Sequence, residues 1–219
     1  MKLCILLFTF LFGMASNAQI INIPDANFKD ALVNSVCADL DGNGHLDGDA
    51  DTNDDGEISV SEAQNVFYLN VDDKGIVSLE GLQYFIHLLR FSCDNNQIIT
   101  LDVSALQYLQ SLGCYNNKIT SLNLGNNTRL KALSCSRNNL TSIDVSQCVN
   151  LERLYALNNE LTQLNVSTLP KLDDLNVQIN ELTSLDVSQN PLLDSLNCGD
   201  NQLSSLDISQ NPLIDWLVC

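Results

Sequence analysis

Residues 193–213 read LDSLNCGDNQLSSLDISQNPL, and the apolar spacing of this stretch returns every 21 residues from Leu88 to Cys219 without an insertion or a deletion. Its first leucine belongs to a column of large apolar residues, which are Leu88, Leu109, Leu130, Leu151, Leu172, Leu193 and Ile214. Three residues further along come Phe91, Leu112, Leu133, Leu154, Leu175, Leu196 and Leu217. Two residues after these come Cys93, Cys114, Cys135, Ala156, Val177, Cys198 and Cys219. Such a fixed period indicates that one structural unit is repeated along the chain.

The pattern L-x-x-L-x-C-x-x-N-x-L-x-x-L-D-V-S within this period is the leucine-rich-repeat signature. Each unit of such a repeat is one coil of a solenoid, because a single unit can bury its apolar face only against its neighbours. In L-x-C alternate side chains point inward, as they do in a β-strand. We therefore predict a right-handed repeat solenoid in which successive coils align these segments into a parallel β-sheet, with strands roughly 4.8 Å apart.

An asparagine column follows the predicted strands, at Asn96, Asn117, Asn138, Asn159, Asn180 and Asn201. A carboxamide carries two donors and an acceptor, so it can pair with backbone groups of the turn that would otherwise be buried without a partner. We interpret this column as structural.

A second stretch of each coil, such as residues 182–188 (Leu-Thr-Ser-Leu-Asp-Val-Ser), predicts a short strand on the opposite wall of the solenoid. An outward polar column on this wall consists of Asp102, Asn123, Asp144, Asn165, Asp186 and Asp207. One interpretation is a line of calcium sites. We favour a solvated polar face, because no second acidic column faces this one and Asn between Asp residues relieves like-charge repulsion over most of its length.

The first 18 residues have the composition of a secretory signal. Lys2 precedes a largely apolar run from Leu3 to Met14, and small residues lie near a cleavage point after Ala18. The run is too short to span a bilayer as a stable anchor, and no later segment approaches 18 unbroken apolar residues. We therefore expect a secreted or cell-surface protein that begins near Gln19 and has no membrane insertion.

The chain is strongly acidic, with 10 basic and 27 acidic residues and a formal charge of −17. Removal of Lys2 with the signal leaves 9 − 27 = −18. This charge argues against nucleic acid and anionic membranes as partners. Thirteen of the acids lie between Asp25 and Asp73, ahead of the regular repeats, which suggests a cation site there.

Cysteines are frequent, and seven remain after removal of the signal. An exported chain with this content would often contain disulfides. Five of the seven occupy the third inward column, however, where parallel side chains of adjacent coils point the same way and disfavour disulfide geometry. We therefore predict buried free thiols in this column. Cys37 and Cys148 lie outside it, and the sequence gives no basis for pairing them.

Residues 19–65 are predicted to form an N-terminal cap with one short helix and one calcium loop. Phe28, Ala31 and Leu32 would share a helical face, and Asp25 after Pro24 is a plausible N-cap. Residues 51–62 (DTNDDGEISVSE) match the twelve-residue calcium loop, with glycine at position 6 for the sharp turn. The predicted metal ligands are Asp51, Asn53, Asp55, Glu57 through its backbone carbonyl, Ser59 and Glu62.

Residues 39–47 contain the first half of a second such loop, but its twelfth position is Ala50. Without the closing carboxylate we expect this loop to bind a metal weakly, to stay empty or to add ligands to the neighbouring site. Because only one calcium loop is complete, we favour a structural metal that locks the cap and do not predict a calcium sensor.

The repeats are predicted to fill residues 66–219, as one degenerate 22-residue coil, six 21-residue coils and a truncated last coil.

Three motifs resemble those of secreted leucine-rich-repeat proteins of Bacteroidetes, which are similar to internalins. They are residues 23–28 (IPDANF), residues 53–63 (NDDGEISVSEA) and residues 75–82 (GIVSLEGL), and coils such as residues 193–207 follow them. The resemblance covers nearly the whole mature chain and implies an adhesion or binding protein of the cell envelope. Such proteins often carry a C-terminal sorting domain, whereas this sequence stops at Cys219 in the middle of a predicted strand, so we expect it to be part of a longer protein.

The residues between the inward columns of the main sheet form a predicted concave face, and they vary from coil to coil. A basic and aromatic cluster gives way along the array to an acidic end. We predict that this face binds a protein or a glycan, since Tyr, Trp and Arg are good anchors for a partner. The candidate binding residues are Arg90, Lys131, Arg153, Tyr155, Asp173, Asp174, Asp194 and Trp216.

Catalysis is not predicted, because the chain has only two histidines and contains neither H-E-x-x-H nor G-x-S-x-G. A carboxylate pair such as Asp173 with Asp194 is the one arrangement that would permit sugar hydrolysis. Two alternatives to a binding scaffold stay open. The array could be a purely structural element, or a structural or targeting domain of a larger exported enzyme.

Overall fold

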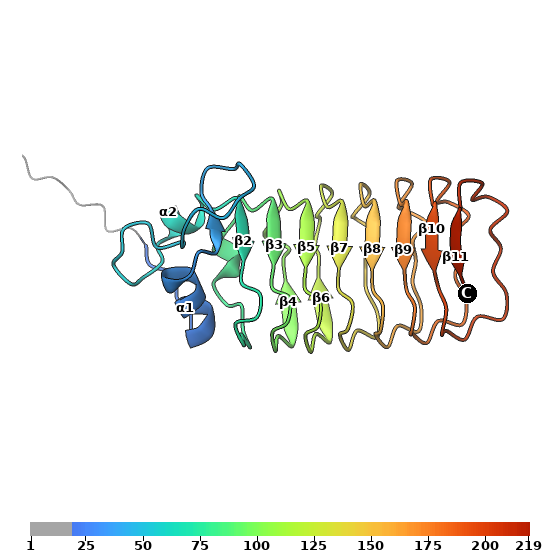
Figure 1. The fold of residues 1–219 in the computed structure, drawn as a ribbon, viewed down its shortest axis with the longest axis horizontal. Helices are drawn as coiled ribbons and strands as arrows, with labels where there is room; N and C mark the ends of the chain where they lie inside the picture. The colour runs from blue at the N-terminus through green and yellow to red at the C-terminus, as the bar shows by residue number, and fades with distance from the viewer. Residues whose placement is uncertain (1–18) are drawn as a thin grey trace, which may run out of the picture.

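The computed structural model describes residues 19–219, so the predicted signal at residues 1–18 lies outside the described part. The chain winds into a solenoid whose nine-stranded sheet extends along the long axis of the molecule (Figure 1). Its strands are β1 (Ala38–Asp39), β2 (Tyr68–Asn70), β3 (Arg90–Ser92), β5 (Ser111–Gly113), β7 (Ala132–Ser134), β8 (Arg153–Tyr155), β9 (Asp174–Asn176), β10 (Ser195–Asn197) and β11 (Trp216–Val218), in this order across the sheet.

Strands β2 to β11 are parallel, and from β3 onward they pair in the 21-residue register of the sequence. Phe91 lies opposite Leu112, for example, and Leu154 lies opposite Leu175. Each three-residue strand points its central residue into the core, and these central residues are buried from Leu69 to Leu196. The predicted repeat solenoid with a parallel sheet and a short helical N-terminal part is therefore confirmed.

The opposite wall is less regular than predicted. In the described part of the chain, strands form on this wall in two coils, as β4 (Thr100–Asp102) and β6 (Ser121–Asn123), which pair in parallel. The outward Asp or Asn closes a local turn in coils with and without these strands, since Asp102 of β4 and Asp144 each accept the N–H of the serine two residues ahead at 2.9 Å. The D-x-S motif of the repeat is thus a turn motif, in which a short polar side chain bonds the backbone two residues ahead.

The asparagine column carries the backbone hydrogen bonds that the turns cannot make among themselves. The Nδ2 of Asn138 donates to the carbonyls of Cys114 at 2.9 Å and Cys135 at 3.0 Å, and its Oδ1 accepts the N–H of Ile119 at 2.9 Å. Asn180 repeats this arrangement two coils later. The predicted structural role is therefore present, and the structure adds that each asparagine ties its own strand exit to the preceding coil.

Two further columns were not identified from the sequence. The residue before each structural asparagine has a left-handed backbone with φ between 53° and 57°, at Asn95, Asn116, Arg137, Asn158, Ile179 and Asp200. A second buried asparagine column contains Asn127, Asn190 and Asn211, and in each of these the Oδ1 atom has no hydrogen-bond partner. The signal for the first column was the recurring Asn-Asn pair, because Asn tolerates the left-handed region better than other non-glycine residues.

The N-terminal cap covers the first coil. Helix α1 (Ala26–Asn34) buries Phe28, Ala31 and Leu32, the face that the sequence predicted. Its N-cap Asp25 accepts two N–H groups of the first helical turn through Oδ1, and those of Val77 and Ser78 in the first coil through Oδ2. Strand β1 adds antiparallel to β2 and so pairs the first edge of the sheet. The short helices α2 (Val60–Ala63) and η1 (Leu82–Tyr84) complete this end.

The cysteines of the column are free and mostly buried, as predicted. All seven described cysteines are free, and Cys219 alone among them is exposed. Burial raises the pKa of the Cys135 thiol to about 12. At the far end of the sheet Trp216, Leu217 and Val218 of β11 are partly exposed. Within residues 19–219 no helix is both long enough and apolar enough to cross a bilayer.

Candidate functional site

The predicted calcium loop at residues 51–62 has an ordered hydrogen-bond pattern. Asp51 at loop position 1 is buried, and its Oδ2 accepts the N–H of Gly56 at 2.8 Å. Gly56 has φ +81°, which explains why glycine occupies this position. Asn53 at position 3 accepts the N–H of Asp55 at 2.9 Å, and Asp55 accepts that of Glu57 at the same distance.

The end of this loop is locked to helix α2 by a capping box. Glu62 Oε2 accepts the N–H of Ser59 at 2.8 Å, and Ser59 Oγ accepts the N–H of Glu62 at 3.2 Å. Thr52 donates its hydroxyl to Glu62 Oε1 at 3.1 Å. Glu57 forms an ion pair of 2.6 Å with Lys29 on α1. Both oxygens of the closing Glu62 therefore have protein partners within the cap.

The half-loop at residues 39–47 repeats the same turn geometry. Asp39 Oδ2 accepts the N–H of Gly44 at 2.7 Å, as Asp51 does with Gly56. Asp41 accepts the N–H of Asn43 at 3.0 Å, and Asn43 accepts that of His45 at 2.8 Å. Strand β1, whose last residue is Asp39, ties this loop directly to the edge of the main sheet.

The half-loop, which the sequence analysis expected to be weak or empty, gathers three carboxylates. One ligand atom from each of Asp39, Asp41 and Asp47 lies within 4.8 Å of the others. Among the described residues this is the only group of three or more Asp, Glu, His or Cys side chains with such spacing. Asp39 is buried and the other two are exposed, so the triad could hold a metal ion with its remaining positions open to solvent.

The outward residues of the nine strands, with the residue preceding each strand from β3 on, form a continuous surface that we call the sheet face. All eight predicted binding residues lie on it. Arg90, Lys131 and Arg153 are exposed on its first half. Asp173, Asp174 and Asp194 lie on its second half, and Trp216 is 47% exposed at its end. The predicted change from basic to acidic character along the array is therefore present in the structure.

Tyr155 marks the boundary between the two halves. Its hydroxyl donates to Asp174 Oδ2 on the next strand at 2.5 Å. Burial and this hydrogen bond raise the pKa of Tyr155 to about 12. The pKa of Asp173 is also raised, first by burial and then by the charges of Asp194 and Glu152. The acidic half is thus a surface of crowded carboxylates that favours a cation.

A hollow of about 350 Å³ lies on the basic half, across strands β2 to β8. Its floor is made of small residues on the three middle strands, namely Ser92, Ser111, Gly113, Ala132 and Ser134. Tyr68 and Arg90 form one bank, and Arg153 and Tyr155 form the other. The sequence analysis identified three of these four bank residues but not Tyr68 or the hollow between them.

Three of the arginines stack on tyrosines of the adjacent coil. Arg90 lies 5.0 Å from the ring centre of Tyr68, Arg129 lies 4.7 Å from that of Tyr108, and Arg137 lies 5.5 Å from that of Tyr115. Such stacking holds a guanidinium in place while its N–H groups stay available. These pairs connect positions in neighbouring coils, so no motif in the linear sequence reveals them.

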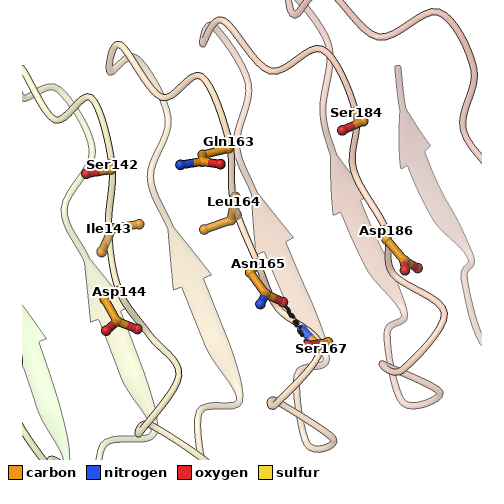
Figure 2. A pocket seen from close by; sticks show the side chains of 9 residues that line it. All are labelled: Ser142, Ile143, Asp144, Gln163, Leu164, Asn165, Ser167, Ser184 and Asp186. Atoms are coloured by element: carbon orange, nitrogen blue, oxygen red, sulfur yellow. Dashed lines mark hydrogen bonds between the residues drawn. The ribbon is translucent and has the colours of Figure 1, made fainter.

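The opposite wall carries a second groove, of about 550 Å³, lined by Asp144, Asn165 and Asp186 on successive coils (Figure 2). The pKa of Asp186 is lowered, because its carboxylate accepts hydrogen bonds from the backbone and side chain of Ser188. Asn165 accepts from Ser167 in the same way, as the dashed line in Figure 2 shows. These polar groups are used within their own turns, in agreement with a solvated structural wall.

Comparison with solved structures places the chain among internalin-like leucine-rich-repeat folds. The functional domain of InlJ from Listeria monocytogenes, described as including a cysteine ladder, aligns with a TM-score of 0.62 and 30% identity over 92% of this chain and 47% of that domain. The chain thus spans about half the length of the InlJ domain. No protein-family model matches the chain, and no curated protein matches it.

Two other bacterial structures share the fold at lower identity. Internalin C2 of Listeria monocytogenes aligns with a TM-score of 0.57 and 21% identity, over 93% of this chain and 97% of that protein. A leucine-rich-repeat protein of Leptospira interrogans aligns with a TM-score of 0.56 and 20% identity, over 71% of this chain and 48% of that protein. The chain is thus an internalin-like leucine-rich-repeat scaffold by its structural neighbours.

Proposed function

We propose that this chain is an exported, non-catalytic binding scaffold that presents its sheet face to a protein partner. The observation that carries this proposal is the contrast between core and face. The inward columns and the asparagine column repeat with the period, whereas the exposed positions of the same strands change from coil to coil and sort by charge. A structural stalk needs no such polarised face, but electrostatic complementarity gives a binding face its specificity and register.

The internalin-like fold supports the same function, and the predicted signal supports export to the medium or the cell surface. Placement among the secreted leucine-rich-repeat proteins of Bacteroidetes remains part of the proposal. Enzymatic activity is not part of it, and the carboxylates of Asp173 and Asp194 are assigned to the binding surface. Their mutual repulsion suits a basic group of the partner.

The test is to screen the mature chain (residues 19–219) against an array of purified extracellular proteins and to map each interaction by substitution. Arg153→Glu and Asp194→Lys change the sheet face, and Gln163→Glu is the matched control on the opposite wall. We expect binding to fall in the first two variants and to stay unchanged in the control. Binding that survives both sheet-face substitutions, or that is lost with Gln163→Glu, would assign the interaction to another surface.

We further propose that the cap binds structural Ca²⁺ in the loop at residues 51–62. Oxygen donors are the ligands that Ca²⁺ prefers, and the predicted set offers carboxylate, amide, hydroxyl and carbonyl oxygens. The buried Asp51 and Glu62 and the left-handed Gly56 support this assignment. Asn53, Asp55, Glu57 and Ser59 complete the set. Bound Ca²⁺ would hold helix α2 and the first coil together.

Thermal unfolding in millimolar Ca²⁺ and in chelator tests the metal site. A ligand that binds only the folded state, at a free concentration of about 100 times its Kd, raises the free energy of unfolding by about 2.7 kcal/mol. We expect the Ca²⁺-dependent rise in Tm to disappear in Asp51→Ala and Glu62→Ala. Asp39→Asn serves as the comparison, because it removes a charge from the half-loop alone. An unchanged wild-type Tm in Ca²⁺ contradicts the proposal, and a rise that only Asp39→Asn abolishes moves the metal to the half-loop.

A further inference from the structure

The hollow on the basic half of the sheet face has the width of one segment of a partner protein. Strands β3 and β8 are three strand spacings apart, which corresponds to about 14 Å. The strands between them, β5 and β7, carry only Ser111, Gly113, Ala132 and Ser134 on this face. An α-helix with its side chains is about 10–12 Å across. A helix or a loop of similar width can therefore approach the backbone of β5 and β7 between the two banks.

Both banks offer a guanidinium that has no carboxylate partner. Within the described residues, the ion pairs join only Lys29 with Glu57 and Lys131 with Glu152, so Arg90 and Arg153 are not in an ion pair. Arg90 is fixed by stacking on Tyr68 and by contact with Gly44, where an added Cβ would lie 2.3 Å from its Nη2. These two arginines flank the same hollow, although the chain as a whole has a formal charge of −17. Together they favour an anionic occupant.

Two carboxylates border the floor of the hollow, since a Cβ placed on Gly113 would lie 3.1 Å from Asp94 Oδ1, and Asp72 is hydrogen-bonded to Ser92 of the floor. One oxygen of each accepts hydrogen bonds from protein donors, which leaves the two guanidinium groups as the unpaired charges of the hollow. Asp72 Oδ1 accepts the hydroxyl of Ser92 at 2.7 Å and the N–H of Asp94 at 2.6 Å. Asp94 Oδ1 accepts the N–H of Tyr115 at 2.6 Å. On the far side, the crowded carboxylates of the acidic half would repel a long polyanion such as a sulfated polysaccharide. The charge pattern instead matches a short acidic segment that is followed by basic residues.

We propose that the hollow is the primary docking site of the sheet face, and that it accepts an acidic helix or loop of a protein partner whose carboxylates pair with Arg90 and Arg153. Basic residues of the same partner would then reach Asp173, Asp174 and Asp194. This inference rests on the proposed binding function and specifies the chemistry of the partner. The small side chains of the floor let the partner backbone come close, and the two banks fix its register.

The probe is a displayed library of random peptides about 12 residues long, which as a helix measure about 18 Å. Peptides selected on the mature chain are measured by fluorescence anisotropy against Ala132→Trp, Arg90→Glu and Arg153→Glu. Ala132→Trp fills the floor of the hollow without touching the core, since the residue points outward. Ser142→Trp on the opposite wall is the matched control. Circular dichroism checks that each variant keeps the wild-type fold.

We expect enriched peptides to carry several acidic residues and to lose about tenfold or more in affinity in each sheet-face variant, as for loss of a paired charge or of a filled pocket. Ser142→Trp should bind within about twofold of wild type. Selected peptides that are neutral or basic, or that bind Ala132→Trp normally, overturn the proposal. If they bind Ala132→Trp normally but are lost in Asp194→Lys, the proposed binding function stands while the hollow is excluded. Insensitivity to every sheet-face variant overturns both.

A sulfated tetrasaccharide serves as the second probe. If it binds at micromolar concentration, and if Ala132→Trp abolishes that binding, the hollow is a glycan site and the assignment to an acidic protein segment is wrong. If the tetrasaccharide does not bind, and if the acidic peptides compete with one another for the wild-type protein, the assignment of the hollow to an acidic protein segment is supported.

Discussion

Replacing Asn138 with alanine should destabilise the protein far more than replacing Asn127 with leucine, although both asparagines are buried in the same part of the solenoid. The Oδ1 of Asn138 is the acceptor for the N–H of Ile119 at 2.9 Å. Its Nδ2 donates to three carbonyls, those of Cys114, Cys135 and Ser136. Alanine removes all four hydrogen bonds at once.

The size of the destabilisation depends on which backbone groups lose their last hydrogen-bond partner. The carbonyls of Cys114 and Cys135 keep bonds from Asn117 and Asn159, and that of Ser136 keeps the N–H of Asn116. Only the N–H of Ile119 becomes a buried orphan, at a cost of about 1–3 kcal/mol. The three weakened carbonyls add about 0.5 kcal/mol each. We therefore expect a loss of about 3 kcal/mol for Asn138→Ala, which for a chain of this size lowers Tm by about 6–12 °C.

Asn127 contributes far fewer hydrogen bonds than Asn138. Its Nδ2 donates only to the carbonyl of Val103 at 3.0 Å, and that carbonyl also accepts the N–H of Leu106. Its Oδ1 is buried without a partner. Leucine, which already occupies this column at Leu106 and Leu169, removes the unpaired oxygen and leaves no orphan. We expect Asn127→Leu to change stability by between zero and about 2 kcal/mol in the stabilising direction.

Urea unfolding followed by far-ultraviolet circular dichroism, under reducing conditions, measures both variants against wild type. A single transition with an unchanged m-value would show that the difference in midpoint reports stability. Equal destabilisation by the two substitutions would refute the reasoning, because it would mean that burial of an asparagine, and not the partners of its carboxamide, decides its contribution. A loss above about 1 kcal/mol in Asn127→Leu would indicate that a buried water pairs with its Oδ1.

Three other predictions concern strain, protonation and thiol reactivity. Ile179 has a left-handed backbone with φ +54°, which a β-branched residue adopts at a cost. Ile179→Asn should therefore stabilise the protein by about 1 kcal/mol in urea unfolding, and the reciprocal Asn158→Ile should destabilise it. A stabilising effect of Asn158→Ile would contradict this reasoning. Burial, with the charges of Asp72 and Asp73, raises the pKa of Asp94 to about 6 from 3.8. The folded state therefore holds this proton more tightly than the unfolded state does, and stability from this group is lost as pH rises from about 4 to 6. Asp94→Asn should thus raise Tm at pH 7 and leave it nearly unchanged at pH 4, and an equal effect at both pH values would exclude Asp94 as the cause. With Ellman's reagent, Cys219 alone of the seven described thiols should react in the native protein, and all seven should react in urea, since six are buried; rapid native labelling of a second thiol would show that a coil opens.

The two acidic loops of the cap show how far residue types can locate a candidate metal site. The spacing of oxygen donors predicted the turn at residues 51–62, and its glycine and its position-1 aspartate lie as that pattern requires. The same spacing gave the half-loop at residues 39–47 a lesser role, because its twelfth position is Ala50. In the structure, however, the half-loop is where three carboxylates converge, and it is joined to the sheet edge by β1. Loop ligand patterns do not encode how neighbouring chain segments orient each carboxylate.

The sequence by itself determined the solenoid, its register, the inward columns and the role of the structural asparagines, because the period of 21 residues leaves one way to align the apolar positions of successive coils. It also determined which residues are exposed on the strands, since side chains alternate along a strand. Only the tertiary structure decided that β1 pairs the first edge of the sheet, that arginines stack on tyrosines of neighbouring coils and that a hollow of small residues separates Tyr68 and Arg90 from Arg153 and Tyr155. These features arise because the fold brings residues about 20 or more positions apart within one strand spacing of each other. They also depend on the directions of side chains in neighbouring coils. No local pattern of the sequence contains either kind of information.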